Sequence, residues 1–400
     1  MKKQLTMIAA TLGVMFTMQT VEALEVDREV MPRVTVAGRL IATPTTTSRD
    51  GFGGEQDEDH NEIGISDSSL LLRFDKRTYD GGVAGAMVGF TKPDQDSDLP
   101  DDVFFHQLNA FYWNKEFEVL FGRTRLPNTL VEFPTLRDDD LLAYTHVPNL
   151  SSFAENDQYQ IYGDVMSFGW HVNPNVTLSA WGGARFETEA DGDRKEEFDI
   201  NSGGVGLVYA QPEELVYLHR IRHAGIMIDY QSVDDGIVDD STYSVIAGAE
   251  WNLNNSPLKN WSAGLQYLYN DGIDGVAITD PNGLARAESW AAVGSVRFTR
   301  RPKLLTRWQA GLSMAYKDYD ENNASQYSIV PSFAYRLGSG IDLVAQYQYS
   351  NLDDALAGVT GYDEEHRIQA GLSFSFDMNF NDTIGERTSI LDTEHSYIRR

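Results

Sequence analysis

The sequence has no cysteine and, beyond its N-terminus, no long apolar run. Without cysteine the chain has no disulfide framework, no thiolate metal site and no thiol nucleophile. A spanning helix needs roughly eighteen apolar residues, so a helical inner-membrane protein is excluded. Basic residues are also scarce, since Lys and Arg number 32 against 60 Asp and Glu, a formal charge of −28. Such acidity argues against nucleic-acid binding.

The N-terminus has the three parts of a secretory signal. Lys2 and Lys3 form a basic region, Leu5 to Met18 is apolar, and Val21-Glu22-Ala23 is a small-x-small cleavage site. Residues 1–23 are therefore expected to be a cleaved signal peptide. Their removal takes away two lysines and one glutamate and leaves an even more acidic chain.

The segment His366 to Phe380 alternates between apolar and polar residues. A strand directs successive side chains to opposite faces, so this segment has one apolar face and one polar face. Trp261 to Asn270 and Thr306 to Tyr319 repeat the pattern, with aromatic residues near the ends of their apolar faces. Behind a secretion signal, this repetition indicates a bacterial outer-membrane barrel.

The expected fold is all-β: a transmembrane antiparallel β-barrel of about sixteen strands, with short and long connections in turn. The barrel spans 24–380 and a polar tail follows at 381–400. An even strand number puts both termini and the tight turns on the periplasmic side. The long loops then lie outside, among them Pro44 to Asn61, Leu126 to Asn156 and Asn351 to Glu365.

Two features fit this pattern less well. Phe111 and Trp113 share a face with Gln107 and Asn109, so the early strands alternate less cleanly. Either these strands contact another subunit or their boundaries are misplaced. Pro331, inside an expected strand, removes a ladder donor and weakens that strand's assignment.

The loop Leu126 to Asn156 carries the features of a known family. It follows Phe121-Gly122-Arg123-Thr124-Arg125 and contains Glu132-Phe133. This arrangement resembles the Gram-negative general porins, which are trimers of sixteen-stranded barrels whose third external loop folds inward. Two departures are Pro134-Thr135, where porins usually have Gly-Gly, and the tail after Phe380, where porins end at an aromatic residue.

The resemblance implies a homotrimer in the outer membrane of a Gram-negative bacterium. Its partners would be membrane lipid, lipopolysaccharide and the barrel-assembly machinery. It also implies a pore whose third external loop folds inward and faces a basic wall. The acidic candidates for this constriction are Glu132, Asp138, Asp139 and Asp140, and the basic candidates are Arg39, Arg73, Arg77, Arg123, Arg125 and Arg137.

Some of these residues also suit roles outside a pore. Asp138, Asp139 and Asp140 precede Leu141-Leu142-Ala143 and are placed to cap a short helix. Arg123 stands two residues after Phe121 and so shares its face of the strand, which leaves open whether Arg123 points into the pore. Acidic loop clusters can also bind calcium or magnesium at a surface.

The sequence has no sign of an active site. It contains neither Gly-x-Ser-x-Gly nor His-Glu-x-x-His. His219 and His223 would form a metal pair on a helix, but a strand is expected to begin there. We therefore predict no catalytic residue, no metal site and no cofactor.

The predicted function is a porin for passive diffusion of small hydrophilic solutes and ions, with a cation preference from its acidic excess. The alternatives are a substrate-specific channel for oligosaccharides or anions, and an outer-membrane enzyme or adhesin. An anion channel needs an excess of inward Lys and Arg, which the overall charge disfavours. A sugar channel needs aromatic residues along its lumen.

Overall fold

The structure is a computed structural model. It describes residues 33–64, 68–78, 82–91, 104–125, 130–131, 133–134, 162–185, 200–211, 220–234, 239–254, 256, 258–272, 287–301, 307–320, 324–338 and 340–380. The predicted signal peptide and the polar tail lie outside these residues.

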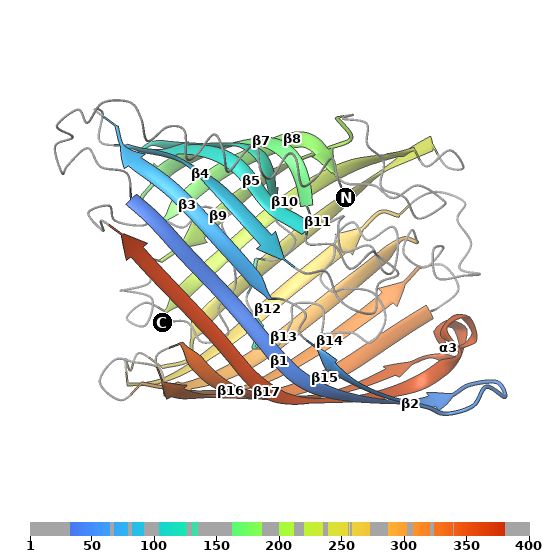
Figure 1. Cartoon of the computed structure of the whole chain (residues 1–400). Helices are drawn as coiled ribbons and strands as arrows, with labels where there is room; N and C mark the ends of the chain where they lie inside the picture. The colour runs from blue at the N-terminus through green and yellow to red at the C-terminus, as the bar shows by residue number, and fades with distance from the viewer. Residues whose placement is uncertain are drawn as a thin grey trace, which may run out of the picture.

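The described chain is almost entirely β-strand, arranged as one curved sheet (Figure 1). The elements are β1 (Arg33–Gly51), β2 (Glu58–Gly64), β3 (Ser69–Arg77), β4 (Val83–Thr91), β5 (Phe104–Trp113), β6 (Phe117–Arg125), β7 (Tyr162–Asn173), β8 (Val176–Arg185), β9 (Ser202–Ala210), β10 (Ile221–Asp234), β11 (Asp239–Asn252), β12 (Lys259–Asn270), β13 (Ser289–Arg300), β14 (Trp308–Tyr319), β15 (Ala324–Gly338), β16 (Ile341–Leu352), α3 (Asp354–Thr360) and β17 (Tyr362–Phe380).

The sheet closes on itself. From β3 to β17 each strand pairs antiparallel with the next, and β1 pairs with β17 from Val34 opposite Phe380 to Gly51 opposite Tyr362. Figure 1 shows these two strands, blue and red, side by side. Closure leaves no edge strand, so the backbone hydrogen bonds are made within the sheet.

β2 and β3 are two parts of one strand, because both pair with β1. Arg39 pairs with Ser69, and Thr43 pairs with Gly64. Between these two pairs the partner strand contains one residue more than β1. Ser68 Oγ accepts a hydrogen bond of 3.3 Å from the Ile41 N–H beside the interruption. Counted as one strand, β2 and β3 give a barrel of sixteen, which confirms the predicted fold class.

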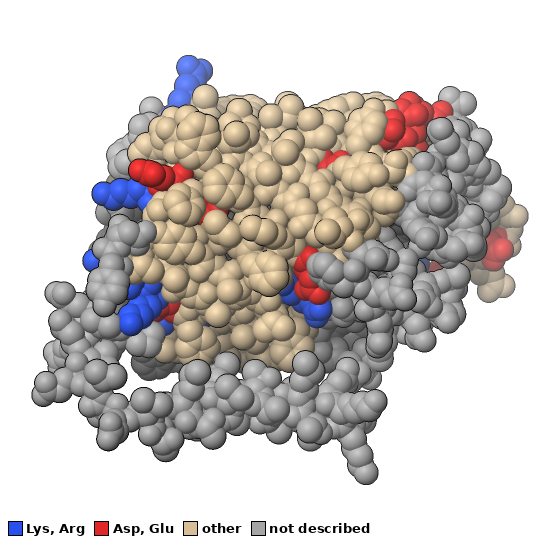
Figure 2. Space-filling model, turned by 90° about the horizontal axis from the view of Figure 1, so that it is seen from above, with Lys and Arg blue, Asp and Glu red and all other residues tan. Residues whose placement is uncertain are grey.

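The barrel has an inside-out distribution of polarity. On β12, Trp261, Leu265 and Tyr267 are 46%, 54% and 44% exposed on the outer face, whereas Gln266 is 1% exposed on the inner face. Figure 2 shows a broad expanse of uncharged side chains on one outer wall, with charged side chains mainly towards its edges. The alternation in the sequence therefore reports an apolar exterior and a polar interior.

The two ends of the barrel differ in their connections. One end, the short-turn end, holds the turns 78–82, 114–116, 174–175 and 339–340 together with the start of β1. The other, the long-loop end, holds the connection from β6 to β7 and the connection 353–361, which contains α3. Asp353 caps α3 by accepting from the N–H groups of Ala355 and Leu356, and Leu356 is buried against Tyr319 and Tyr362.

Two predicted loop boundaries are wrong. β1 continues to Gly51 and β2 begins at Glu58, so most of the predicted loop Pro44 to Asn61 is a paired hairpin. β17 begins at Tyr362, inside the predicted loop Asn351 to Glu365. Both segments are polar on their two faces and therefore look like loops, but their hydrogen bonds to neighbouring strands hold them extended.

The structure resolves both irregularities in the predicted pattern. Phe111 lies on the inner face of β5 with Gln107 and Asn109, while Leu108, 51% exposed, faces outward. The mixed face is therefore the inner one and is not evidence of a subunit contact. β15 continues through Pro331, which lies opposite Leu312 of β14 and points outward.

Among the described residues, no helix is long and apolar enough to cross a membrane.

The turn between β15 and β16 gives a prediction about stability. Gly340 has a φ of +70°, and a Cβ there would collide with the Ser375 carbonyl oxygen. We expect Gly340→Ala to lower the free energy of unfolding by about 1–2 kcal/mol or more, from the left-handed backbone and the collision. Gly338→Ala in the same hairpin is the control, because a Cβ there has no atom within 4 Å. Urea unfolding in lipid vesicles measures both, and equal midpoints would contradict this account.

Candidate functional site in the barrel interior

The inner face carries most of the charged side chains that could act on a solute. Alternation along the strands, together with burial, identifies them. Within the described strands the inner basic side chains are Arg33, Arg39, Arg49, Arg73, Arg77, Arg222, Arg297, Lys317, Arg336 and Arg367. The inner acidic side chains are Glu58, Asp75, Glu118, Asp229, Glu250, Asp342 and Glu365. On this described surface, basic side chains outnumber acidic ones.

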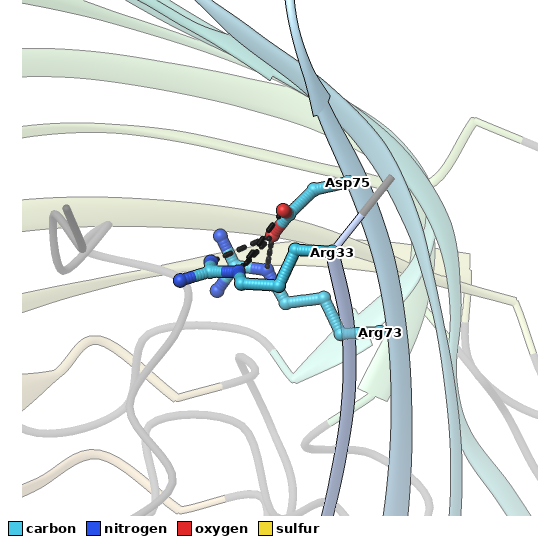
Figure 3. Close-up of polar contacts among 3 residues, drawn as sticks. All are labelled: Arg33, Arg73 and Asp75. Atoms are coloured by element: carbon cyan, nitrogen blue, oxygen red, sulfur yellow. Dashed lines mark hydrogen bonds and ion pairs between the residues drawn. The ribbon is translucent and has the colours of Figure 1, made fainter. Parts of the chain in front are cut away.

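One buried carboxylate is shared by two arginines (Figure 3). Asp75 of β3 accepts from Arg33 Nε at 3.0 Å and from a terminal nitrogen of Arg33 at 2.7 Å. Arg73 Nε donates to the same carboxylate at 2.8 Å. The Arg73 guanidinium also lies 4.8 Å from the centre of the Phe111 ring. Among these three residues, two guanidinium groups therefore share one carboxylate.

A similar cluster lies near the long-loop end. The Glu365 side chain is fully buried, and its carboxylate is 2.8 Å from Arg49 Nε and 3.7 Å from a terminal nitrogen of Arg367. Elsewhere the inner pairs are one to one. Arg222 lies 2.5 Å from Glu250, and Arg336 Nε lies 3.0 Å from Asp342. Among the ion pairs of the described residues, the two shared carboxylates lie on β3 and β17, beside the closure.

A short segment beyond β6 lies against the opposite inner wall. The backbone N–H groups of Leu130 and Val131 donate to Gln266 Oε1 of β12, at 2.7 and 3.1 Å. Leu130 packs on an apolar cluster with Met227, Ile246 and Leu268. Hydrogen bonds and apolar burial together fix this segment inside the barrel.

Glycines on the inner face make room for this segment. A Cβ on Gly225 would lie 3.1 Å from Leu130, and a Cβ on Gly264 would lie 2.6 Å from Val131. Further along, Phe133 packs on Val293, Ala315 and Val330, and Ser332 donates to the Pro134 carbonyl oxygen. The described part of the segment therefore passes over the inner faces of strands from β10 to β15.

The structure places only some of the predicted pore residues. Arg39, Arg73 and Arg77 lie on the inner wall. The prediction that Arg123 faces the pore is wrong. Arg123 lies on the outer face with Phe121, where it pairs with Asp164 at 3.0 Å. The parity shared with Phe121 decides its direction. Glu132, Arg137 and Asp138 to Asp140 lie outside the described residues, as does the side chain of Arg125.

The sequence prediction missed the shared-carboxylate clusters. Arg33 and Arg49 have the same parity as Arg39, and Arg367 stands on the polar face of the most regular strand. Parity alone could therefore have identified these three arginines. Their sharing of Asp75 and Glu365 depends on the pairing of β1 with β3 and β17, which the sequence does not show.

Solved structures resemble the chain, although no family model and no curated protein sequence matches it. The TM-score is 0.59 with the anion-selective porin from Comamonas acidovorans, at 14% identity over 86% of this chain and 100% of that chain. It is 0.56 with the outer membrane channel DcaP of Acinetobacter baumannii, at 14% identity over 86% and 98%. Against OmpF of Salmonella typhi it is 0.55, at 10% identity over 86% and 97%. At these identities the likeness shows the fold, a closed antiparallel barrel of the kind found in outer-membrane porins.

The contact between Gly264 and Val131 gives a prediction that exploits the absence of cysteine. With Leu130→Cys as the only thiol, maleimide labelling reports release of the segment, because Leu130 is 4% exposed. Gly264→Ala should overpack this contact by about 1–3 kcal/mol. Labelling should then accelerate about five- to a hundredfold, since 1.4 kcal/mol is about tenfold. Gly294→Ala is the control, because a Cβ there has no atom within 4 Å. Equal labelling in both variants would contradict the contact.

Proposed function

We propose that this chain is an outer-membrane porin of a Gram-negative bacterium, exported by a signal peptide at 1–23. It forms a water-filled channel for passive diffusion of small hydrophilic solutes and ions. The observation that carries the proposal is the closed barrel with an apolar exterior and a polar, charged interior. Lipid suits the first surface and water suits the second. Passive diffusion requires no cofactor.

The inner hydroxyl groups support a hydrated interior. Ser313, Ser328 and Thr124 lie on the inner face, and their buried hydroxyls have no hydrogen-bond partner within the described part of the chain. A buried polar group without a partner costs about 1–3 kcal/mol. A buried ordered water beside each hydroxyl would satisfy it at little cost.

The segment anchored on Gln266 supports a narrowed pore. Leu130 to Pro134 belongs to the long predicted loop Leu126 to Asn156, and its described residues lie inside the barrel. We propose that this loop forms the constriction. Glu132, Asp138, Asp139 and Asp140 would supply its acidic side. The basic side would come from Arg39, Arg73 and Arg77 of the wall, with Arg125 and Arg137 nearby.

We propose a homotrimer that contacts through the outer faces of β3 to β7, by analogy with trimeric porins. The outer faces of β6 and β7 carry Phe121, Met166 and Phe168, with the Arg123–Asp164 ion pair among them. An ion pair is better placed in a protein interface than in lipid. Native mass measurement in mild detergent should give three copies. Arg123→Leu with Asp164→Leu should preserve the barrel but weaken assembly, and monomers of the intact protein would contradict the proposal.

Liposome swelling tests the channel. Vesicles with the folded protein should swell in small sugars, at rates that fall as solute mass rises and do not saturate with concentration. Deleting 136–150, which leaves Leu130 to Pro134 in place, should raise the rates for the larger sugars most. Vesicles with heat-unfolded protein provide the baseline. Swelling at that baseline with correctly folded protein would refute the proposal, and unchanged rates after the deletion would refute the constriction.

Ion preference has two opposing sources in this chain. The formal charge of −28 and the acids of the long loop favour cations. The described inner wall favours anions, because basic side chains outnumber acidic ones on it. The balance depends on which charges lie nearest to the permeating ion.

A further inference from the structure

The outer surface of β12, β13 and β14 carries three cationic side chains at the short-turn end. Lys259 begins β12, Arg300 ends β13 and Arg307 precedes β14, and all three side chains are exposed. Lys259 lies directly opposite Arg300 in the pairing of β12 with β13. Arg300 in turn lies opposite Trp308 of β14. We call the three cations Lys259, Arg300 and Arg307 the outer basic patch.

The two cations of the cross-strand pair repel each other. Side chains directly opposite in a sheet have Cβ atoms about 4.5–5.5 Å apart, and like charges at such positions are destabilising. Within the part of the chain that the structure describes, neither Lys259 nor Arg300 is paired with a carboxylate. The adjoining connections 253–258 and 301–307 contain no Asp or Glu in their sequence. An anion from outside the chain would therefore relieve this repulsion.

The third cation lies over an aromatic ring of the next strand. Arg307 Nε and a terminal nitrogen of Arg307 donate to Tyr335 Oη at 3.1 and 2.7 Å, and the guanidinium lies 4.9 Å from the centre of that ring. Tyr335 lies opposite Trp308 on the outer face of β15. The Arg307 N–H also donates to the Arg300 carbonyl oxygen at 2.8 Å. These contacts hold Arg307 beside Arg300 without neutralising its charge.

Aromatic rings lie next to the patch, towards the middle of the barrel wall. Trp261 and Phe298 lie opposite each other with ring centres 4.7 Å apart, and the rings of Phe298 and Trp308 are 5.0 Å apart. Arg300 stands two residues beyond Phe298 on the same face, which is roughly 7 Å of strand. Aromatic rings gather at the membrane–water interface. The cations beyond them therefore lie at the level of lipid headgroups.

The opposite edge of the same outer surface carries carboxylates. Glu288 accepts from Tyr269 Oη at 2.5 Å. Asp318 accepts from Trp290 Nε1 at 3.1 Å. Positions 288 and 300 are about 40 Å apart along a strand, or about 30 Å along the membrane normal at a tilt of about 40°. This span equals a hydrocarbon core of about 30 Å, so Glu288 and Arg300 mark its two edges with charges of opposite sign.

We infer that the outer basic patch binds the headgroup of an anionic phospholipid in the leaflet at the short-turn end, with the phosphate between Lys259 and Arg300. The inference rests on the proposed placement of the barrel in the outer membrane, where this end faces the periplasm. A phosphodiester accepts hydrogen bonds from both cations. Its acyl chains would lie along Trp261 and Phe298. β12 to β14 are on the side of the barrel opposite β4 to β6, so the patch faces lipid in the proposed trimer.

Native mass spectrometry of the folded full-length protein in neutral detergent measures this binding. Each cation near a lipid headgroup strengthens binding by about fivefold, so phosphatidylglycerol should bind about tenfold or more tightly than phosphatidylcholine. The variant Lys259→Gln with Arg300→Gln should lose about tenfold or more of the affinity for phosphatidylglycerol. Lys259→Arg with Arg300→Lys should keep it. Lys76→Gln with Lys115→Gln removes two exposed cations from the short-turn end at other strands and should leave the affinity unchanged.

Urea unfolding in lipid vesicles gives a second measurement. Phosphatidylglycerol should raise the unfolding midpoint of the intact protein more than that of the Gln variant, because a ligand that binds the folded state stabilises it. Equal affinity of the intact protein for the two lipids, or an unchanged affinity in the folded Gln variant, would overturn the inference. Displacement of phosphatidylglycerol by inorganic phosphate would assign the patch to a free anion and would also overturn it.

Conductance in phosphatidylcholine bilayers separates this inference from the proposed channel. A protein that conducts but does not distinguish the two lipids would refute the lipid site alone. A protein that prefers phosphatidylglycerol but gives no conductance would refute the channel alone.

Discussion

The pairing of β1 with β17 closes the barrel and so determines which side chains face its interior. It joins residues more than three hundred positions apart, such as Arg49 and Glu365, whose separation is 316. Closure satisfies the backbone hydrogen bonds that would otherwise be exposed at two sheet edges. Only in a closed sheet does side-chain alternation separate an inside from an outside. The polar interior, the shared carboxylates and the anchored segment all follow from that separation.

The inner wall of the barrel has a hydrogen-bond acceptor and free space where Leu130 and Val131 lie against it. Gln266 receives two backbone N–H groups from Leu130 and Val131, and Gly225 and Gly264 leave the space that their side chains fill. A glycine costs strand stability because it loses conformational freedom on folding. Here that cost is offset by the close approach between the wall and this segment.

Much of the fold could be predicted from the sequence, because alternation is a local property. Ile368 to Phe374 shows its apolar face by alternation alone, and the same alternation would have placed Arg33, Arg49 and Arg367 inside. The outward direction of Arg123 was also open to this reasoning. The hairpin of β1 and β2 was not, because polar residues on both faces have no alternation to detect. The contact of Leu130 with Gln266, at a separation of 136 residues, has no local signal.

We propose that the closed barrel holds a continuous aqueous path. Single-channel recording of the purified, folded protein in a planar bilayer tests this claim most directly. We expect discrete conductance steps with a linear current–voltage relation at low voltage, because the path is passive and its wall is fixed. Folded protein that inserts into the bilayer and gives no conductance steps would contradict it, and would show that the interior is filled.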